Sequence, residues 1–473
     1  MDKKNIYLTT TLPYVNSDPH IGFALEIVQA DTIARFKRLQ GHDVFFNFGT
    51  DEHGLKIYRK ALEQGKDPQE YVNEYAAKFD SLKKALNLTY NNFIRTTDKH
   101  HIKAAQEFWE KCLENGNIYK DKYAVKYCVG CELEKTESEL ENDRCPIHPN
   151  LELEVINEEN YFFRFSKYKD SLLKFYEQNP DFVVPSFRLN EINSFVEEGL
   201  QDFSVSRLKS KMPWGIEVPD DPKHVMFVWF DALVNYVSAV GWPDDSEKFK
   251  KWWPVIQFAG KDNLRQQSAI WQAMLMSAGL PNSKQIFIHG FITVDGQKIS
   301  KSLGNVVNPI ELVRKYGTDP VRYFLLSKIH PFEDSDFTIE KFEDAHNSDL
   351  ANGLGNLVAR VAKLCEEAEA KGIGKFDENF DLINADLASF RFDSALDKIW
   401  QQIKFLDRRI NNEGPWKIKD KKQLKEKLYE YSYEILNISH LLRPFLPETA
   451  KKIEKQFSAS KIKSEAPLFP RIK

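Results

Sequence analysis

The sequence predicts an α/β protein, in which an insertion splits a parallel sheet and an α-helical bundle follows. Three observations lead to this fold class. A strand, a helix and a second strand follow one another with short joins near the start of the chain, which indicates a βαβ unit and parallel strands. After about residue 115 short strands and a cysteine-rich knuckle interrupt this pattern. Beyond residue 337 the pattern becomes almost wholly helical.

Size and composition narrow the class of protein. The chain has 473 residues, enough for several domains with large cores. It has no apolar run of the length that crosses a membrane, and its start, MDKKNIYLTTT, lacks an apolar signal region, so we expect a cytoplasmic protein without membrane contact. The five cysteines favour a reducing compartment and a metal site over a disulfide framework, because their number is odd and three of them cluster.

The first βαβ unit opens with residues 5–12, NIYLTTTL, which predict a short strand. Asp18 followed by Pro19 predicts a helix start, with the acid as the N-cap and the proline at the first helical position. An apolar face then runs from Ile21 through Leu25, Val28 and Phe36 to Leu39, and Gly41 marks a plausible end of the helix. The next stretch, DVFFNFGTDEHG, predicts a buried strand that ends in a polar loop.

His20 falls in the first turn of the predicted helix, directly after a strand. Ligands of open parallel sheets bind at this place, and the free N–H groups of a helix start favour anions. An imidazole there can donate to a phosphate oxygen, and Gly22 allows a flat ring to approach the backbone. A structural or merely exposed histidine remains the alternative when His20 is considered alone.

The insertion carries four residues with the spacing of metal ligands. Cys128, Cys131, Cys145 and His148 offer three thiolates and one imidazole, a closed tetrahedral set for one structural zinc ion. A knuckle without metal is the alternative. Cys112 and Cys365 lie elsewhere in the chain and are expected in the core. Four domains are therefore predicted. The two halves of the α/β domain are residues 1–115 and 225–336, the insertion between them is 116–224, and the helical domain is 337–473.

The α/β pattern returns after the insertion and ends in a cationic loop. VDGQKISKSLGN, residues 294–305, alternates Lys298 and Lys301 with two serines. Such a loop suits the negative charge that develops in phosphoryl or nucleotidyl transfer, although an exposed basic loop is an equal alternative. The chain has no Gly-rich loop ending in Lys-Ser/Thr, which disfavours an ordinary P-loop ATPase.

The helical part offers two features suited to RNA. In GNLVAR, Asn356 and Arg360 lie one helical turn apart. Gly414 and Pro415 end the next helical stretch and leave Trp416 on a turn. An arginine and a free aromatic ring can bind an unstacked base, whereas the pattern alone favours an ion pair and a ring that plugs a helix end.

These stretches together resemble a known family. PHIGF and KISKS resemble the two signatures of class I aminoacyl-tRNA synthetases, and the rest of the chain resembles the methionyl-tRNA synthetases over nearly its whole length. The likeness includes TLPYVNSDPHIG, GTDEHG, CVGC with CPIH, NEINSFVEEGLQDFSVSR, FVWFDALVNY, GKDN, HGFITVDGQKISKS, GNLVAR and NNEGPW, in the order of the family.

The resemblance implies a Rossmann-like catalytic domain, a zinc knuckle, an anticodon-binding helical bundle and the activation of methionine by ATP with Mg²⁺. It implies His20, Lys298 and Lys301 as catalytic residues. The residues implied to bind ATP are Pro19, His20, Gly22, Gly260, Asp262, His289 and Lys301. Those implied to bind methionine are Leu12, Tyr14, Asp51, Trp229, Tyr236 and Gln267, with Trp229 and Tyr236 on one helical side. Two residues depart from the family pattern, because many relatives carry histidine at the positions of Phe23 and Gln267.

The resemblance also implies the partners. These are L-methionine and tRNA(Met), including the initiator tRNA, whose CAU anticodon is implied to contact Asn356, Arg360 and Trp416. The chain ends without the oligonucleotide-binding module that dimerises many relatives, so we expect a monomer. Three alternatives stay open: a class I synthetase specific for valine, leucine or isoleucine, a non-catalytic tRNA-binding paralogue, and a nucleotidyltransferase acting on a small metabolite.

Overall fold

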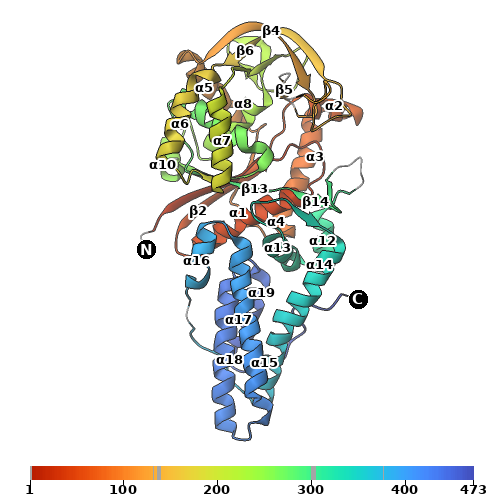
Figure 1. Ribbon diagram of the computed structural model, residues 1–473, viewed down its shortest axis with the longest axis vertical. Coiled ribbons are helices and arrows are strands. Elements are labelled where there is room, and N and C mark those ends of the chain that lie inside the picture. The colour runs from red at the N-terminus through yellow and green to blue at the C-terminus, as the bar shows by residue number, and fades with distance from the viewer. Residues whose placement is uncertain (1–2, 132, 136–139, 300–304, 377, 473) are drawn as a thin grey trace. The chain divides into compact units, whose positions relative to one another are not determined.

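The computed structural model describes residues 3–131, 133–135, 140–299, 305–376 and 378–472. The chain divides into two compact units, each built from three separate segments (Figure 1). The first unit comprises Met1–Pro19, His42–Ser81 and Tyr90–Ile288. The second comprises His20–Gly41, Leu82–Thr89 and His289–Lys473. The helix after the first strand therefore belongs to a different unit from that strand.

A six-stranded sheet forms the centre of the first unit, with the order β3-β2-β1-β12-β13-β7. The pairs β1–β12, β1–β2, β2–β3 and β13–β7 are all parallel, which confirms the predicted parallel sheet. Seven of the eight residues of β2 are buried, as its continuous apolar run predicts. The strands are β1 (Asn5–Thr10), β2 (Asp43–Thr50), β3 (Asn92–Arg95), β7 (Val183–Val184), β12 (Val255–Gly260) and β13 (Gln285–His289).

Aromatic side chains on short helices cover this sheet within the first unit. Phe108 and Trp109 of α5 belong to the same buried cluster as Tyr7 of β1, and the Phe108 ring stacks on Trp271 with centroids 5.6 Å apart. Each fully buried large side chain stabilises the fold by about 1.5–3 kcal/mol. The helices of this part are α2 (Leu55–Glu63), α3 (Pro68–Asp80), α5 (Lys99–Glu114), α8 (Val228–Leu233), α9 (Asn235–Ser238), α10 (Ser246–Trp252), the 3₁₀ turn η3 (Lys261–Asn263), the π-helical turn η4 (Gln266–Ile270) and α11 (Trp271–Ser277).

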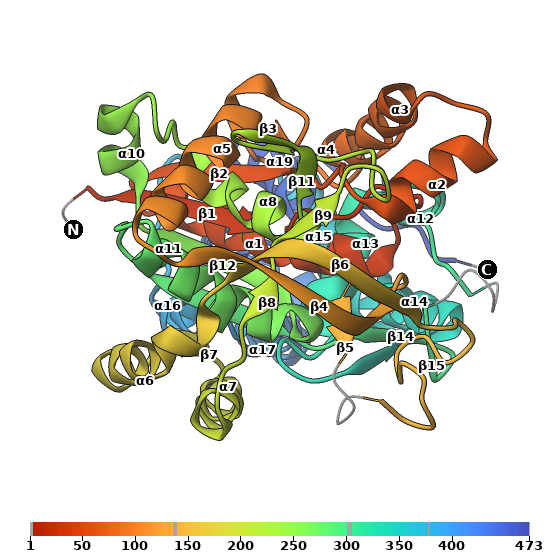
Figure 2. The ribbon, with the colours of Figure 1, turned by 90° about the horizontal axis from the view of Figure 1, so that it is seen from above.

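The insertion contains both strands and helices. Its longest strands, β4 (Ile118–Cys128) and β6 (Glu154–Phe163), pair antiparallel along their length (Figure 2). The sequence predicted short strands, a cysteine-rich knuckle and a polar stretch here, whereas β4 and β6 have 11 and 10 residues and the insertion also contains the helices α6 (Lys169–Gln178) and α7 (Ser186–Glu198). The remaining elements are β5 (Leu133–Lys135), η2 (Phe165–Tyr168), β8 (Phe203–Ser204), β9 (Ser206–Leu208), β10 (Glu217–Val218) and β11 (Asp221–Met226).

The second unit begins with α1 (Ile21–Leu39), which starts later than predicted. The N-cap is His20 rather than Asp18, and Pro19 precedes the cap instead of occupying the first helical position. The helix is not amphipathic either, because every residue from Ala24 to Ala34 is buried, whereas Leu39 on the predicted apolar face is 39 % exposed. The predicted stop is confirmed, since Gly41 has a φ of 87° directly after the C-cap.

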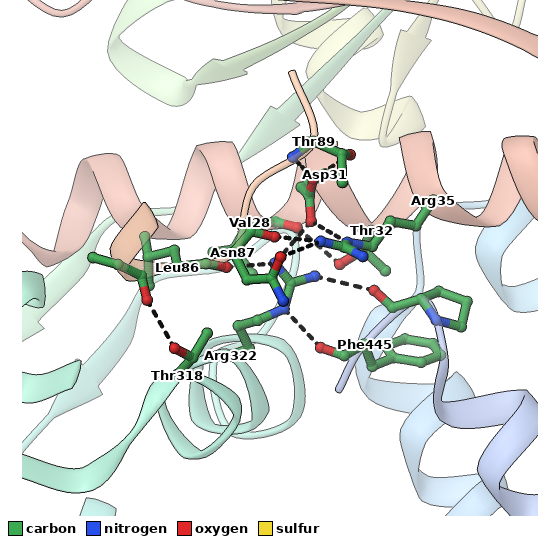
Figure 3. Close-up of polar contacts among 12 residues, drawn as sticks. Val28, Asp31, Thr32, Arg35, Leu86, Asn87, Thr89, Thr318, Arg322 and Phe445 are labelled. Carbon is green, nitrogen blue, oxygen red and sulfur yellow. Dashed lines mark hydrogen bonds and ion pairs between the residues drawn. The ribbon is translucent and has the colours of Figure 1, made fainter. Parts of the chain in front are cut away.

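Buried polar bonds hold α1 within the second unit (Figure 3). The Arg322 guanidinium of α13 (Thr318–Ser327) lies 2.8 Å from Oδ2 of Asp31 in α1, and both side chains are fully buried. Arg35 approaches the same Oδ2 at 2.7 Å. Arg322 also donates to the carbonyl oxygens of Leu86 and of Phe445, which lies in the turn between α18 (Lys421–Leu442) and α19 (Pro447–Phe457). One arginine thus joins α1 to the helical part of the unit.

The rest of the second unit is predominantly helical, as predicted. Helices α15, α17, α18 and α19 run side by side in Figure 1. Within the described residues, no helix combines the length and apolar character needed to cross a membrane. The elements are α4 (Leu82–Ala85), β14 (Ile292–Val294), β15 (Gln297–Lys298), α12 (Pro309–Tyr316), α13 (Thr318–Ser327), β16 (Ser335–Phe337), α14 (Ile339–Ala345), the π-helical η6 (His346–Gly355), α15 (Asn356–Glu367), α16 (Asp381–Ala388), α17 (Phe392–Glu413), the 3₁₀ turn η7 (Pro415–Lys417), α18 (Lys421–Leu442) and α19 (Pro447–Phe457).

Candidate functional site

His20 caps the first helix of the second unit with its own ring. Nδ1 accepts a hydrogen bond from the backbone N–H of Gly22 at 3.1 Å, so the ring proton resides on Nε2. Burial lowers the pKa of His20 to about 4, and the Phe23 ring packs against it with centroids 4.3 Å apart. A Cβ on Gly22 would lie 2.9 Å from His20 Cε1, so only glycine leaves room for this ring. His20 is therefore a neutral donor through Nε2–H at the helix start.

The chain that flanks the cationic loop contacts the same helix start. The N–H of Ile21, the first residue of α1, donates to the carbonyl oxygen of Val307 at 3.0 Å. On the other flank, Gly296 N donates to Asp336 Oδ1 at 2.7 Å, and β15 pairs with β14. Lys301 and the side chain of Lys298 lie outside the described residues. The described residues that follow the loop nevertheless place Val307 in contact with the first residue of α1.

A buried histidine forms a pair with α1 that the sequence did not indicate. His289 Nε2 lies 2.9 Å from Oε2 of Glu26, and its Nδ1 lies 2.7 Å from the carbonyl oxygen of Gly290. Because that carbonyl can only accept, Nδ1 of His289 carries a proton. A Cβ on Gly290 would lie 2.2 Å from the backbone of Glu333, so this position requires glycine. His289 is thus held in one orientation.

Two residues implied to bind methionine lie side by side in the first unit. Tyr14 and Asp51 form a parallel bridge, in which Val15 N donates to Asp51 O and Asp51 N donates to Pro13 O. The Asp51 residue is 7 % exposed, and Leu12 packs against the main core at its border. Asp51 therefore offers a carboxylate in surroundings that are largely shielded from water.

Trp229 and Tyr236, which were predicted on one helical side, belong to two different helices. Val234 separates α8 from α9, and the two rings lie in different clusters. Tyr236 is 2 % exposed in the main core, whereas Trp229 packs with Tyr14 in a smaller cluster. The seven-residue spacing assumed one continuous helix, whereas α8 ends before Val234 and the two rings pack in different clusters.

The remaining predicted residues of the first unit lie near the carboxyl end of β12 or beyond it. Gly260 is the last residue of β12, and Asp262 follows in η3. The Gln267 side chain is 1 % exposed and accepts a hydrogen bond from Gln257 Nε2 at 2.7 Å. Ligands of parallel sheets bind beyond the carboxyl ends of the strands, which suits Gly260 and Asp262.

Sequence reasoning missed the bonds that hold the loop after β2. Both carboxylate oxygens of Glu52 accept from Arg95, at 2.6 and 2.9 Å. Next to it, His53 and His101 bind the carboxylate of Asp231. His53 belongs to the quoted GTDEHG stretch, but its partner is 178 positions away and no local pattern joins the two.

The cysteine knuckle brings its four residues together. One ligand atom from each of Cys128, Cys131, Cys145 and His148 lies within 4.8 Å of all the others. Cys131 Sγ lies 3.5 Å from Cys145 Sγ and 3.2 Å from His148 Nδ1. A tetrahedron of 2.3 Å zinc–sulfur bonds has edges of about 3.8 Å, so the donor set fits one zinc ion. A Cβ on Gly130 would lie 2.5 Å from the His148 ring, which explains a glycine between the first two ligands.

The residues implied to bind an anticodon lie toward one end of the helical part. Arg360 of α15 donates to Asp407 Oδ1 at 2.6 Å and to Asn411 Oδ1 at 2.7 Å near the end of α17. Trp416 lies in the turn η7 after that end and is 54 % exposed. The exposed first residue of α15 is Asn356. The ion-pair alternative is therefore correct for Arg360, whereas Trp416 does not plug a helix end.

Known proteins share this arrangement. A family model described as tRNA synthetases class I (M) matches residues 6–148 and 130–362. Methionine–tRNA ligase of Thermotoga maritima is 44 % identical over 474 residues, which covers 96 % of this chain and 75 % of that protein. The same ligase of Nostoc is 42 % identical and covers 96 % and 90 % of the two chains. Methionyl-tRNA synthetase of Mycobacterium tuberculosis in complex with methionyl-adenylate superposes with a TM-score of 0.92 at 35 % identity, over 99 % of this chain and 100 % of that one.

A parallel-sheet core, a Cys₃His insertion and a helical carboxyl-terminal part, together with these matches, define a class I tRNA synthetase, a ligase that forms aminoacyl-tRNA. The matched relatives cover nearly all of the chain at well over 30 % identity. The chain belongs to the methionine–tRNA ligase family.

Proposed function

We propose that this chain joins methionine to the 3′-end of tRNA(Met), initiator tRNA included, through a methionyl-adenylate. The phosphate site is assigned from the contacts at the N-terminal end of α1. There a neutral His20 presents its Nε2–H and the flank of the cationic loop bonds to the first N–H of the helix. A neutral donor suits an oxygen that gains charge during reaction, because the bond strengthens as the charge develops.

Methionine activation requires positioning more than acid–base catalysis. The methionine carboxylate is ionised at neutral pH and can attack the α-phosphorus of ATP without a general base. The bond from the α-phosphorus to the bridging oxygen breaks, and pyrophosphate leaves with the Mg²⁺ that entered with ATP. In our proposal Lys301, with Lys298, neutralises the charge of the leaving group, while His20, at the start of α1, holds the phosphates through its Nε2–H.

The remaining ATP contacts follow from the family positions. We propose that Pro19 and Gly22 keep the helix start open to the nucleotide, and that Gly260 and Asp262 bind it beyond the end of β12. His289 is held by Glu26 at 2.9 Å and Gly290 at 2.7 Å, and this fixed ring supports a role in orienting ATP.

Methionine binding in our proposal centres on Asp51. Its carboxylate takes the α-ammonium as a charge-assisted partner, which is strong where water is scarce. Trp229 and Tyr14, which share one cluster, form an aromatic wall for the thioether. Leu12, at the border of the main core, and the buried Tyr236 and Gln267 are proposed as further contributors to the same pocket. The matched relatives are named for methionine, which favours it over valine, leucine and isoleucine.

The decisive experiment is ATP–pyrophosphate exchange by the purified chain with methionine, leucine or valine, followed by charging of tRNA(Met). We expect exchange that depends on methionine, and charging of the tRNA. Exchange with leucine or valine instead would support a neighbouring specificity. The absence of exchange with every amino acid, combined with tRNA binding, would support a non-catalytic paralogue.

Lys301→Ala tests the role of the cationic loop. We expect methionine binding to stay within about twofold of wild type, and exchange to slow at least about a hundredfold, the scale of one lost charge contact in a transition state. Lys315→Ala is the matched control, since Lys315 is an exposed lysine of the same unit that pairs with Glu343. Exchange at the wild-type rate in Lys301→Ala would contradict the assignment.

A further inference from the structure

Three buried side chains of the first unit form a cluster that the proposed chemistry does not use. Nδ1 of His53 lies 2.7 Å from Oδ2 of Asp231, and Nε2 of His101 lies 2.8 Å from Oδ1. The side chains of His101 and Asp231 are fully buried, and that of His53 is 7 % exposed. We call these three residues the His–Asp–His cluster.

The hydrogen bonds of this cluster fix how each ring is turned. A carboxylate only accepts, so each histidine must direct an N–H toward Asp231. Burial raises the pKa of Asp231, but the bonds from His53 and His101 outweigh it and leave the pKa below its usual value. Ser238 Oγ lies 2.9 Å from His101 Nδ1, so both nitrogens of that ring have a partner. Satisfied buried networks of this kind hold a single geometry.

The cluster joins two elements that carry methionine-binding residues. His53 lies two positions after Asp51, in the loop that follows β2. Asp231 lies two positions after Trp229, in α8. His101 belongs to α5, whose aromatic residues pack in the main core of the same unit. A bond between His53 and Asp231 therefore sets the loop of Asp51 against the helix of Trp229.

The bonds of the neighbouring residue Glu52 hold the same loop but do not reach α8. Glu52 ties the loop to Arg95 at 2.6 Å and accepts through its backbone oxygen from Trp214 Nε1 at 2.6 Å. Neither partner belongs to α8. Among the bonds described for this loop, the one from His53 is the bond that reaches α8.

We propose that His53 and Asp231 are positioning residues for methionine, which hold the Asp51 carboxylate and the Trp229 ring at the separation that the bound amino acid requires. The inference rests on the proposed function. It assigns to the cluster no contact with substrate. Its effect on catalysis arises because a displacement of about 1 Å at a reacting or binding group can cost about a hundredfold in rate.

The test compares two substitutions at one position. His53→Leu removes the donor at similar size, whereas the side-chain amide of His53→Asn places an N–H near the position of Nδ1. In ATP–pyrophosphate exchange, we expect His53→Leu to raise the KM for methionine at least about tenfold and to leave the KM for ATP within about twofold. His53→Asn should stay within about threefold of wild type for both substrates.

His224→Leu is the matched control. His224 is also a buried histidine of the first unit bonded to an aspartate, with Nδ1 3.0 Å from Asp221 Oδ2, and no proposed methionine-binding residue lies within two positions of either partner. It should lower the melting temperature in the way that His53→Leu does, while both KM values stay near wild type. An unchanged KM for methionine in His53→Leu, or an equal rise in both KM values, would overturn the inference.

Asp231→Asn covers the case in which His53→Leu does not fold, because it preserves shape while removing the charge that both histidines share. We expect a rise of at least about fivefold in the KM for methionine, and a wild-type value would refute the role of the cluster. Methionine-dependent exchange by the wild-type chain distinguishes failure of the proposed function from failure of the positioning role. Wild-type chain without methionine-dependent exchange refutes the proposed function, whereas an active wild type with normal variants refutes only the positioning role.

Discussion

At the scale of single residues, the ring of His20 is neutral at neutral pH because burial lowers its pKa to about 4. Protonation of Nδ1 would also remove the helix cap, since that lone pair accepts the N–H of Gly22. The Phe23 ring lies against His20, with ring centroids 4.3 Å apart. In the proposed function, His20 is therefore an uncharged donor to phosphate, and neutralisation of charge is assigned to the lysines of the loop.

This low pKa predicts how stability depends on pH. The folded state holds His20 with a pKa of about 4, below the ordinary value of 6.5, so its contribution to stability is complete above pH 6.5 and declines as the pH falls toward 4. His20→Asn keeps a good N-cap that does not titrate. We expect the melting temperature of wild type to fall more steeply than that of His20→Asn across this window. Parallel curves for the two proteins would contradict the assignment.

At the scale of elements, the Asp31–Arg322 pair determines how α1 is held in its unit (Figure 3). Arg322→Met replaces the guanidinium by an apolar chain and leaves Asp31 with one arginine partner fewer in a fully buried place. We expect a loss of about 3–5 kcal/mol in the free energy of unfolding. Denaturant unfolding of the full chain, monitored by helix content, measures it.

The control for this prediction is a surface pair of the same unit. Lys363 and Glu367 lie 3.5 Å apart with both side chains 61 % exposed, so Lys363→Met should cost no more than about 1 kcal/mol. A similar small effect in Arg322→Met would mean that the buried pair contributes no more than a solvated one.

The cysteine knuckle is the second element with a direct test. Its four ligands leave no open position, so the metal is expected to stabilise the insertion rather than to take part in chemistry. We expect one zinc ion per chain by elemental analysis, a lower melting temperature after chelation, and loss of the metal in Cys131→Ser. Cys365→Ala is the control, because Cys365 is a buried cysteine outside the cluster. A metal-free protein whose melting is indifferent to chelator would contradict this prediction.

At the scale of the whole molecule, we predict that the helical part binds the tRNA through Trp416. Trp416 is 54 % exposed on the turn that follows α17, and stacking of one base on an aromatic ring is worth about 1–3 kcal/mol. We expect Trp416→Ala to raise the KM for tRNA by about 5- to 150-fold and to leave exchange without tRNA unchanged. Tyr429→Ala, with a ring 55 % exposed on α18, is the control. Equal charging by Trp416→Ala and wild type would refute the contact.

Much of the fold could be predicted because it depends on local pattern. The buried run of β2 and the helices beyond residue 337 appear where apolar spacing places them. The start of α1 could not be predicted from the local pattern. Asp18 and Pro19 have the sequence of a helix start, but the helix begins after His20, whose side chain caps it. In the same way, the spacing from Trp229 to Tyr236 carries no information about the break at Val234.

The sequence by itself determined the family, the parallel sheet and the metal-binding set, because motif order, periodicity and ligand spacing are all written along the chain. Only the tertiary structure decided which nitrogen of His20 carries the proton and which carboxylate His53 meets. These outcomes depend on burial and on partners that folding brings together from distant positions in the chain. His53 and Asp231, for example, are 178 positions apart. Local pattern carries no record of such distances.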